Sequence, residues 1–324
     1  MTRILGIGNA LVDILTIVEQ EELLVELNLP KGSMQLVDAD TAIKVALFTQ
    51  HLKKSKASGG SAANTIHGLA RLGVNTSFIG HVGEDETGDF FYNDMLLANI
   101  QPVLFRSSTP SGIANAMITS DSERTFATYL GAAIELSELH LSPSLFDGFT
   151  MLYVEGYLVQ NEALLLKAMQ LAKDAGLKIV LDLASYNVVE ANRAILNLVL
   201  EQYVDIVFAN EEEAKALTSK EPEEALRALA SVCEIAIVKI GAKGSLIKKG
   251  DQVVHIYAIP ANPVDTTGAG DLFASGFIYG LVSDFDLEKS GRIGSLLAGK
   301  VIEVVGPKMD AQRWKMIFEE IEKL

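Results

Sequence analysis

The sequence predicts an α/β fold built around a mostly parallel β-sheet. In the second half of the chain, short apolar runs with strand character alternate with amphipathic segments of helical period. Such alternation is typical of right-handed βαβ units, which place successive strands parallel in one sheet. Two glycine-rich segments, residues 59–64 and 262–271, each lead directly into a predicted helix. Because ligands of parallel sheets bind beyond the carboxyl ends of the strands, we expect the functional residues at that edge.

The composition narrows the class of protein. The 324 residues include 27 Lys and Arg against 42 Asp and Glu, a net charge of −15, which is unlike the basic surface of a general nucleic-acid binder. The single cysteine, Cys233, allows neither an internal disulfide nor a cysteine metal cluster. No uninterrupted apolar run reaches the roughly 18 residues of a membrane span. We therefore expect a cytoplasmic protein that binds small molecules, with neither a nucleic acid nor a membrane as a partner.

In the N-terminal third, apolar runs bounded by Gly, Asn and Asp predict strands, and the amphipathic segments between them predict helices. The expected strands are 4–7, 33–37 and 78–83, and the expected helices are 19–27, 38–54, one after 59–64 and one from Asp85. Residues 103–130 interrupt the pattern, because β-prone runs at 114–119 and 125–129 flank a turn signal at 121–123. We expect these runs to form a small β-sheet outside the main core.

After residue 139 the alternation is regular. Three polar or glycine positions, Asp182, Asn210 and Gly241, fall at the ends of predicted strands, where ligands are expected. The expected strands are 151–154, 178–183, 206–209 and 235–240, and the expected helices are 163–175, 189–201, 211–217 and one from residue 272.

The segment 262–271 predicts an anion site. Its small residues bring backbone N–H groups to the start of a helix, where these groups have no intrahelical partner and the dipole adds partial positive charge. Phosphate is the usual anion at such a site. Asp271 is unexpected there, because a carboxylate repels phosphate. Two interpretations stay open: Asp271 is the helix N-cap, or it is a general base that accepts a proton from an attacking hydroxyl group.

Residues 265–271, Asp-Thr-Thr-Gly-Ala-Gly-Asp, resemble the C-terminal signature of the ribokinase (PfkB) family of carbohydrate and nucleoside kinases. Gly-Gly-x-x-x-Asn at 59–64, followed by Ala-Arg-Leu-Gly at 70–73, resembles the N-terminal signature of the same family. The resemblance implies one ribokinase-like kinase domain over residues 1–324, with a three-layer core. It also implies a small β lid from approximately residues 10–18, 32–40 and 103–130, which closes to exclude water and whose exposed edge would permit a homodimer.

The resemblance implies phosphoryl transfer from ATP. The backbone N–H groups of Gly268, Ala269, Gly270 and Asp271 would form an anion hole for the transferred phosphoryl group. The Asp271 carboxylate would accept the proton of the acceptor hydroxyl group. A P-loop match at 294–300 does not compete with this interpretation, because it lies in an apolar helical run and ends in Val301, which cannot bind Mg²⁺.

The family's metal and nucleotide positions also have counterparts. Asn210 and Glu213 match its Asn-x-x-Glu element, which organises Mg²⁺ through water, although the two residues equally fit an N-cap with an acidic first turn. Lys239 matches an ATP-binding position where Thr is usual. Further ATP contacts are implied for Gly241, Gly244 and Thr267. The resemblance leaves open whether Asp265 and Thr267 hold a monovalent cation such as K⁺, as they do in some members.

On the acceptor side, Asp13 matches the carboxylate that binds acceptor hydroxyl groups, since a carboxylate accepts two hydrogen bonds from a diol. An ordinary turn residue is the alternative for Asp13. The resemblance implies that three further residues close the same pocket, namely Gly59, Gly60 and Asn64.

The segments 33–36, 123–132 and 153–158 most resemble the adenosine-kinase branch, especially its bacterial members. This resemblance implies that Gln35 lies at the nucleoside, that Arg124 reaches the phosphates from the lid, and that Tyr157 stacks on the base or packs in the core. The expected reaction is 5′-phosphorylation of adenosine to AMP, a purine-salvage step. The alternatives are a sugar kinase of the ribose or fructose type, a non-catalytic nucleotide or sugar sensor, and a scaffolding protein.

Overall fold

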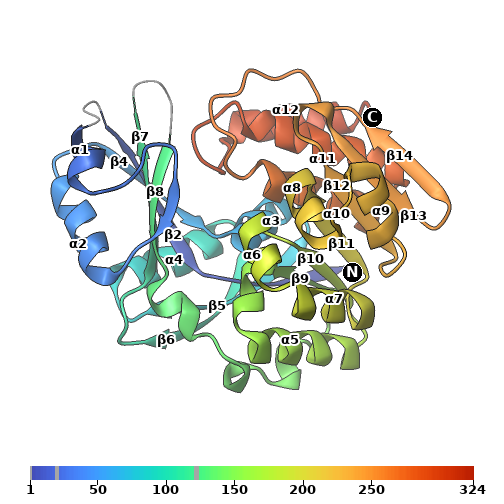
Figure 1. Ribbon diagram of the computed structural model, residues 1–324, viewed down its shortest axis with the longest axis horizontal. Coiled ribbons are helices and arrows are strands. Elements are labelled where there is room, and N and C mark those ends of the chain that lie inside the picture. The colour runs from blue at the N-terminus through green and yellow to red at the C-terminus, as the bar shows by residue number, and fades with distance from the viewer. Residues whose placement is uncertain (1, 19–21, 120–123) are drawn as a thin grey trace.

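The computed structural model describes residues 2–18, 22–119 and 124–324, with the side chain of Arg124 outside this description. The described part contains a nine-stranded sheet flanked by helices and a separate five-stranded sheet (Figure 1). The small sheet is built only from the N-terminal half of the chain, and the C-terminal half completes the large one. The predicted α/β class is therefore confirmed.

The large sheet has the order β14-β13-β12-β11-β10-β9-β1-β5-β6, and its seven strands from β12 to β6 are parallel. Only β13 runs against its neighbours, β12 and β14. The strands are β1 Arg3–Ile7, β5 Asn75–Gly83, β6 Ile100–Ser107, β9 Met151–Glu155, β10 Lys178–Asp182, β11 Ile206–Asn210, β12 Ile235–Lys239, β13 Ser245–Lys249 and β14 Gln252–Ile256.

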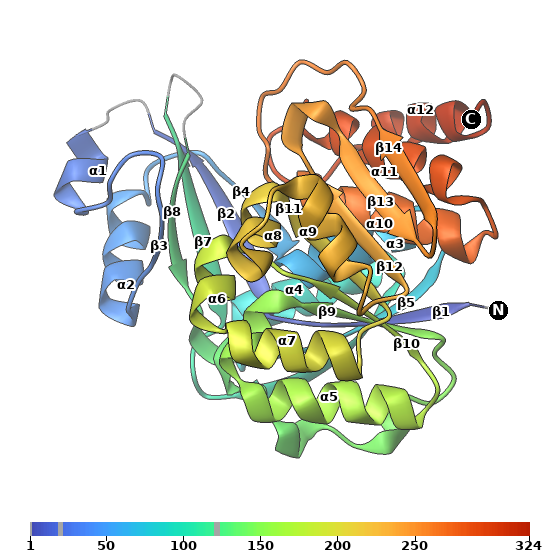
Figure 2. The ribbon, with the colours of Figure 1, turned by 45° about the vertical axis from the view of Figure 1, so that its right-hand side comes forward.

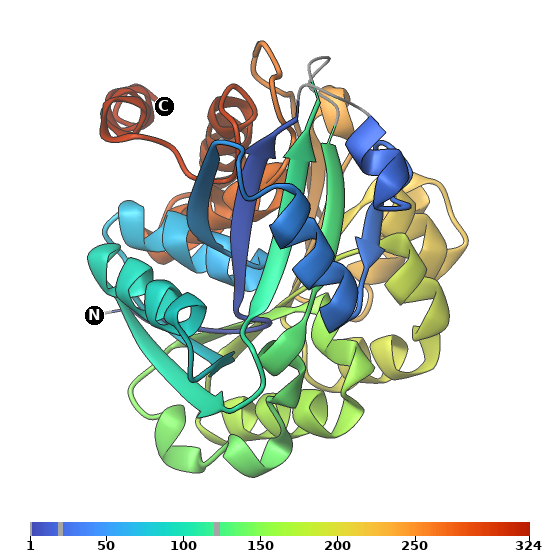
Figure 3. The ribbon, with the colours of Figure 1, turned by 90° about the vertical axis from the view of Figure 1, so that its left-hand side faces the viewer.

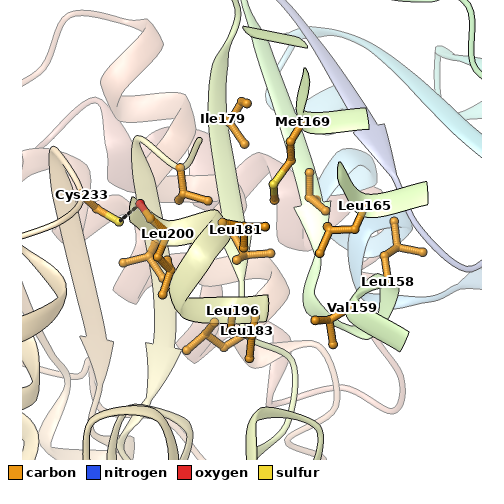
Figure 4. Close-up of a cluster of buried hydrophobic side chains, with 14 of the residues drawn as sticks. Leu158, Val159, Leu165, Met169, Ile179, Leu181, Leu183, Leu196, Leu200 and Cys233 are labelled. Carbon is orange, nitrogen blue, oxygen red and sulfur yellow. Dashed lines mark hydrogen bonds between the residues drawn. The ribbon is translucent and has the colours of Figure 1, made fainter. Parts of the chain in front are cut away.

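Helices cover both faces of this sheet, because alternate strand residues point to opposite sides. On β10, Leu181 packs in one apolar cluster and Val180 in the other. Figure 4 shows the first cluster, in which Cys233 Sγ donates to the carbonyl oxygen of Leu200 at 3.9 Å. The first face is covered by α5 Glu162–Asp174, α6 Tyr186–Ala191, α7 Arg193–Gln202, α8 Glu211–Thr218 and α9 Pro222–Leu229, and the second by α3 Ser61–Arg71, α4 Glu86–Leu97, α10 Ala269–Val282 and α11 Leu287–Val301.

The small sheet has the order β3-β8-β7-β2-β4. Helices α1 and α2 pack on one of its faces, where Val45 of α2 lies in one cluster with Met117 and Ala127 of the sheet, and the two helices lie on the side away from the large sheet (Figures 2 and 3). We call this five-stranded sheet with its two helices the lid. Its elements are β2 Leu11–Ile17, β3 Met34–Leu36, β4 Lys54–Gly59, β7 Gly112–Ile118, β8 Arg124–Tyr129, α1 Glu22–Glu26 and α2 Ala39–Phe48.

Four short links join the lid to the large sheet and its helices. Residues 8–10 connect β1 to β2, Gly60 connects β4 to α3, residues 108–111 connect β6 to β7, and Leu130 connects β8 to the short 3-10 helix Gly131–Glu135 that leads back to the core. The chain thus passes repeatedly between the two sheets at one edge. Residues in these links lie where the lid meets the core.

Some predicted boundaries differ from the structure. The lid was expected to include residues from 103 onwards, but β6 pairs with β5 in the large sheet. The strand β4, which starts at the last residue of the predicted helix 38–54, belongs to the lid. The predicted helix 189–201 is two helices that meet at Asn192. The predicted turn at 121–123 lies outside the described residues. Among the helices of the described ranges, which end with α12 Ala311–Ile321, none combines the length and apolarity needed to cross a bilayer.

We expect Leu181→Ala to lower the free energy of unfolding by about 2–5 kcal/mol, because Leu181 is fully buried in the first cluster and the neighbouring helices cannot close the cavity. Leu97→Ala is the matched control, since Leu97 is 81% exposed, and it should change the stability by less than about 0.5 kcal/mol. Urea unfolding followed by circular dichroism measures both. Equal effects would contradict the assignment of the core.

Candidate active site

Helix α10 begins at Ala269, and Gly268 precedes it as the N-cap residue with a left-handed φ of 77°. Glycine is required there for that φ and because a Cβ would lie only 2.7 Å from the Cβ of Pro307. Asp271 therefore lies in the first helical turn. The N-cap interpretation of Asp271 is wrong, because the helix starts earlier than its apolar pattern indicated.

The Asp271 carboxylate accepts two hydrogen bonds from α3. Ser61 Oγ donates to Oδ1 at 2.8 Å, and Asn64 Nδ2 donates to Oδ2 at 3.0 Å. Burial raises the pKa of Asp271 to about 6, against the lowering effect of the Asn64 hydrogen bond. A carboxylate with this pKa is still ionised at neutral pH and is a stronger base than an ordinary Asp. The two glycine-rich segments of the sequence thus meet at one carboxylate.

The predicted anion hole lies beside this carboxylate. Of its donors, the N–H group of Ala269 already donates to the carbonyl oxygen of Thr266 at 3.2 Å. The N–H groups of Gly270 and Asp271 belong to the same first turn, where a helix offers no intrahelical acceptor. The hole stays a prediction that rests mainly on these two groups.

Lys239 ends β12 next to this turn, since a Cβ on Gly270 would lie 3.0 Å from Lys239 Nζ. The same Nζ lies 3.1 Å from Oδ2 of Asp182, at the end of β10. Burial by itself lowers the pKa of Lys239, but Asp182 and Glu213 raise it above its ordinary value. The lysine at the position of the family's Thr therefore brings a positive charge to the predicted anion hole. Sequence reasoning marked Asp182 only as a strand end and assigned it no role.

Asn210 and Glu213 form a capping box at the start of α8. Asn210 Oδ1 accepts from the Glu213 N–H group, and the Glu213 carboxylate accepts from both the backbone and the side-chain nitrogen of Asn210, each at 2.8 Å. Burial raises the pKa of Glu213 to about 7, and Lys239 opposes that rise. The N-cap alternative for this pair is therefore correct as local structure. Both side chains already bind each other, so they fit a metal only through intervening water.

Asp265 is held in the loop before α10. Its Oδ1 accepts from the Thr267 N–H group at 3.0 Å, and its Oδ2 accepts from the Gly306 N–H group at 2.6 Å. These bonds tie the loop to the segment that follows α11. In the ranges that the structure describes, no group of three or more His, Cys, Asp or Glu side chains is arranged to hold a metal ion. A monovalent-cation site at Asp265 and Thr267 stays a prediction.

Asp13 lies on β2 against β4, and a Cβ on Gly59 would overlap the Asp13 carboxylate. Gly60 has a left-handed φ of 95°, and a Cβ there would overlap the carbonyl oxygen of Asn9. Gly59 thus lets the Asp13 carboxylate lie against the end of β4, and Gly60 lets the chain pass the carbonyl group of Asn9 on its way into α3. Asn64 is also brought here, but its amide donates to Asp271, so it contacts the predicted base and not only the acceptor pocket.

Glu155, to which the sequence motifs assigned no role, links three parts of this region. Its Oε1 accepts from the backbone and side-chain nitrogens of Asn9, at 2.8 and 2.7 Å, and its Oε2 accepts from the Ala62 N–H group at 3.0 Å. Burial raises the pKa of Glu155 to about 7. This carboxylate at the end of β9 therefore fixes one lid link and the start of α3 to the large sheet.

The register of the lid determines which side chains share a face with Asp13. Asp13 pairs with Ala114, Ala114 pairs with Thr128, and Thr128 pairs with Leu36. Directly paired residues lie on the same face of a sheet, so Asp13 and Leu36 belong to one cross-strand row. Gly306 of the core packs near Leu15, two residues from Asp13, so this face of the lid is turned towards the core.

Gln35 lies on the opposite face. It pairs with Ala127, which is buried in the cluster under α2. The register therefore contradicts the predicted contact of Gln35 with a nucleoside. Met34 and Leu36, which are 59% and 63% exposed, take its place on the face of Asp13. The residues alone do not reveal this, because a shift of one position exchanges the two faces of a strand.

The remaining predicted residues lie near the same edge. Gly241 and Gly244 both have left-handed φ values, 58° and 100°, and they turn the chain from β12 into β13. Tyr157 is partly buried and packs against the first apolar cluster, where burial raises its pKa to about 12. That contact matches the core-packing alternative for Tyr157. The backbone of Arg124 pairs with Ile118 in the lid, and its side chain lies outside the description.

The doubly covered parallel sheet, the lid and the carboxylate at a glycine-rich helix start define a class of protein, the ATP-dependent kinases that phosphorylate an alcohol group. A comparison with protein families identifies the particular kinase family. Residues 34–313 match the pfkB family carbohydrate kinases. The chain therefore belongs to the PfkB family, as the two signatures predicted.

Individual relatives carry different names. A probable sugar kinase from Rhizobium etli has 33% sequence identity and a TM-score of 0.88, and the match covers 98% of both chains. The adenosine kinase from Sinorhizobium meliloti has 32% identity and a TM-score of 0.87 over 98% of this chain and 99% of that one. A 5-dehydro-2-deoxygluconokinase from Bacillus licheniformis is 31% identical over 78% of this chain and 83% of its own length. The chain is similar to nucleoside and sugar kinases alike.

We expect Lys239→Met to lower the free energy of unfolding by about 3 kcal/mol, because it leaves the Asp182 carboxylate, 6% exposed, without its cation. Adding Asp182→Asn should recover most of that loss. Lys249→Met is the control, since Lys249 pairs with Glu234 at the surface and should contribute less than about 1 kcal/mol. Urea unfolding of the wild type, Lys239→Met, Asp182→Asn and the double variant measures the coupling, and Lys249→Met is measured beside them. Additive effects of the two substitutions would contradict a direct Lys239–Asp182 pair.

Proposed function

We propose that this protein transfers the γ-phosphoryl group of ATP to a primary hydroxyl group of a nucleoside, most consistently the 5′-hydroxyl of adenosine, with Asp271 as the general base. The observation that carries this proposal is the Asp271 carboxylate, held by Ser61 and Asn64 in the first turn of α10. The same turn supplies N–H groups for the phosphoryl group. A proton acceptor and an anion site are thus a few atoms apart, as phosphoryl transfer requires.

The chain's own residues fit the remaining parts of the reaction. The Lys239 cation would balance charge on the phosphoryl group as it moves. Mg²⁺ with ATP would supply further charge neutralisation, and Asn210 and Glu213 would organise its water. Asp13 would hold the acceptor's hydroxyl groups over Asp271. As the bond from phosphorus to the acceptor oxygen forms and the bond to ADP breaks, the hydroxyl proton passes to Asp271.

A nucleoside is favoured over a free sugar by the apolar side chains on the inner face of the lid. Leu36 lies three strand spacings from Asp13 along one row, about 14 Å. An acceptor that covers both must extend beyond a sugar ring, and a purine base has the flat apolar surface that exposed Met34 and Leu36 would bury. The similarity to the Sinorhizobium meliloti adenosine kinase over nearly the whole chain supports the same choice.

A sugar kinase is the second candidate, favoured by the relatives with that name and by the Asp13 carboxylate, which suits any vicinal diol. The expected protein is cytoplasmic, and a homodimer through the lid edge stays part of the proposal. A non-catalytic sensor would bind ATP without turnover.

We expect Asp271→Asn to bind ATP normally and to lose roughly 10²-fold or more in kcat, because the amide cannot accept the acceptor's proton. Since the pKa of Asp271 is raised to about 6 and the ionised form is the base, wild-type kcat/KM should fall as pH drops below about 6. The control is Asp286→Asn, because Asp286 only caps α11 and Asn caps as well. Coupled ADP-release assays across pH measure all three proteins. Near-normal turnover in Asp271→Asn would refute the base.

We expect turnover with adenosine to exceed that with ribose, fructose or 5-dehydro-2-deoxygluconate offered separately with Mg-ATP. Leu36→Ser should then raise the KM for adenosine about tenfold, since part of the base loses its apolar contact, and leave the KM for ATP unchanged. Gln35→Ala, on the opposite face, should have little effect. A larger effect from Gln35→Ala, or better turnover with a free sugar, would overturn the nucleoside assignment.

A further inference from the structure

Lys308 is a buried ammonium group that no motif and no step of the proposed reaction uses. Its Nζ is shielded from solvent, and among the described residues it has no hydrogen-bond partner. An ammonium in such a place is costly, because its hydration is lost without replacement. Burial accordingly lowers the pKa of Lys308 to about 8. A lysine kept there at a cost to stability calls for a functional explanation.

The segment that carries Lys308 is fixed at the acceptor side of the site. Gly306 donates to Asp265 at 2.6 Å and packs near Leu15 of the lid strand β2. Pro307 lies against Gly268, the residue that starts α10. Lys308 follows between these anchors, and Met309 is buried in the cluster under α11 and α12. The segment of Lys308 is therefore held between β2, which carries Asp13, and α10, which carries Asp271.

Carboxylates approach Lys308 from three elements. Asp94 on α4 acts on it most strongly, followed by Asp13 on β2 and Asp271 on α10, and each raises the pKa of Lys308 against the effect of burial. Asp94 already accepts a hydrogen bond from the Ser58 N–H group of β4 at 3.0 Å. His67 on α3 adds no competing charge, because burial, with Lys308 and Arg71, lowers its pKa well below the ordinary value.

Asp271 also faces charges from the sheet. Asp182 raises its pKa and Lys239 lowers it. Lys239, however, is already paired with Asp182 at 3.1 Å. Lys308 makes no hydrogen bond in the described part of the chain, so its charge is shared among the carboxylates of Asp94, Asp13 and Asp271.

We propose that Lys308 is a positioning residue whose buried charge keeps the two acceptor-site carboxylates, Asp13 and Asp271, ionised together at neutral pH. The inference rests on the proposed roles of Asp13 and Asp271. Two carboxylates that face one bound hydroxyl group raise each other's proton affinity, and a cation enclosed with them reverses that effect. Because Lys308 Nζ is sealed from solvent, it acts through these two groups and contacts neither acceptor nor ATP.

The first test is the pH dependence of kcat/KM in Lys308→Met, which keeps the side-chain length and removes the charge. The acid limb of the profile should move up by about one pH unit, giving roughly a tenfold loss on that limb. The loss should disappear well above pH 7, where the Asp271 carboxylate is ionised in both proteins. Lys308→Arg should retain the wild-type acid limb. Lys300→Met, which removes a surface charge paired with Glu320, is the control and should leave the profile unchanged.

A second measurement does not depend on any acceptor. Carbon-13 NMR of the labelled Asp carboxyl groups, assigned with Asp271→Asn, reports the pKa of Asp271 directly in the resting protein. It should be higher in Lys308→Met than in the wild type. The Tm of Lys308→Met should exceed that of the wild type at pH 7, and the difference should narrow as pH rises from 8, because the unpaired ammonium is then no longer charged.

The outcomes separate this inference from the proposed reaction. If no acceptor is phosphorylated, the proposed function fails and the NMR titration still decides the role of Lys308. An Asp271 pKa that is the same in wild type and Lys308→Met overturns the inference. So does a loss of activity that is equal at every pH and equal in the Met and Arg variants, because that pattern indicates packing and not charge.

Discussion

The hydrogen bonds from Ser61 and Asn64 to Asp271 join two segments that are far apart in the sequence, and the arrangement of the site depends on them. They require α3 and α10 to lie unusually close. A Cβ on Gly68 would overlap the Ser275 hydroxyl group, which itself donates to the carbonyl oxygens of Thr65 and Asp271. The two helices are therefore locked by the same contacts that position the carboxylate.

Burying that carboxylate creates an excess of negative charge at the carboxyl edge of the sheet. Burial raises the pKa of Asp271 to about 6 and the pKa values of Glu155 and Glu213 to about 7. Each group binds its proton more tightly in the folded than in the unfolded chain, so each makes the fold less stable as pH rises from the ordinary carboxyl range to 6 or 7. Lys239 and Lys308 are enclosed cations that offset this charge, one on the proposed phosphate side and one on the proposed acceptor side.

Much of the core could be predicted because its signals are local. The strands of the second half and the two glycine loops follow from periodicity and from the family signatures, whereas the contacts of Ser61 and Asn64 with Asp271 come from the structure. The small sheet was predicted less accurately. No local sequence pattern shows whether β6 pairs with β5 or joins the lid. No local pattern shows the strand register that turns Gln35 away from Asp13 either. The roles of Glu155 and Lys308 could not be predicted for another reason. Each residue acts through its burial, and burial is a property of the assembled fold.

The position of Glu155 shows how the lid and the chemistry are connected. Its carboxylate binds Asn9, in the link to the lid strand that carries Asp13, and Ala62, between the two residues that hold Asp271. Any movement of the lid about residues 8–10 and Gly60 therefore turns about a point fixed to the end of β9. In the proposed reaction, such a movement would bring Asp13 towards the acceptor or away from it while Asp271 stays in place. An acceptor that binds both Asp13 and the apolar inner face of the lid would stabilise the closed position, and the same movement would then select the size and the reactivity of the acceptor.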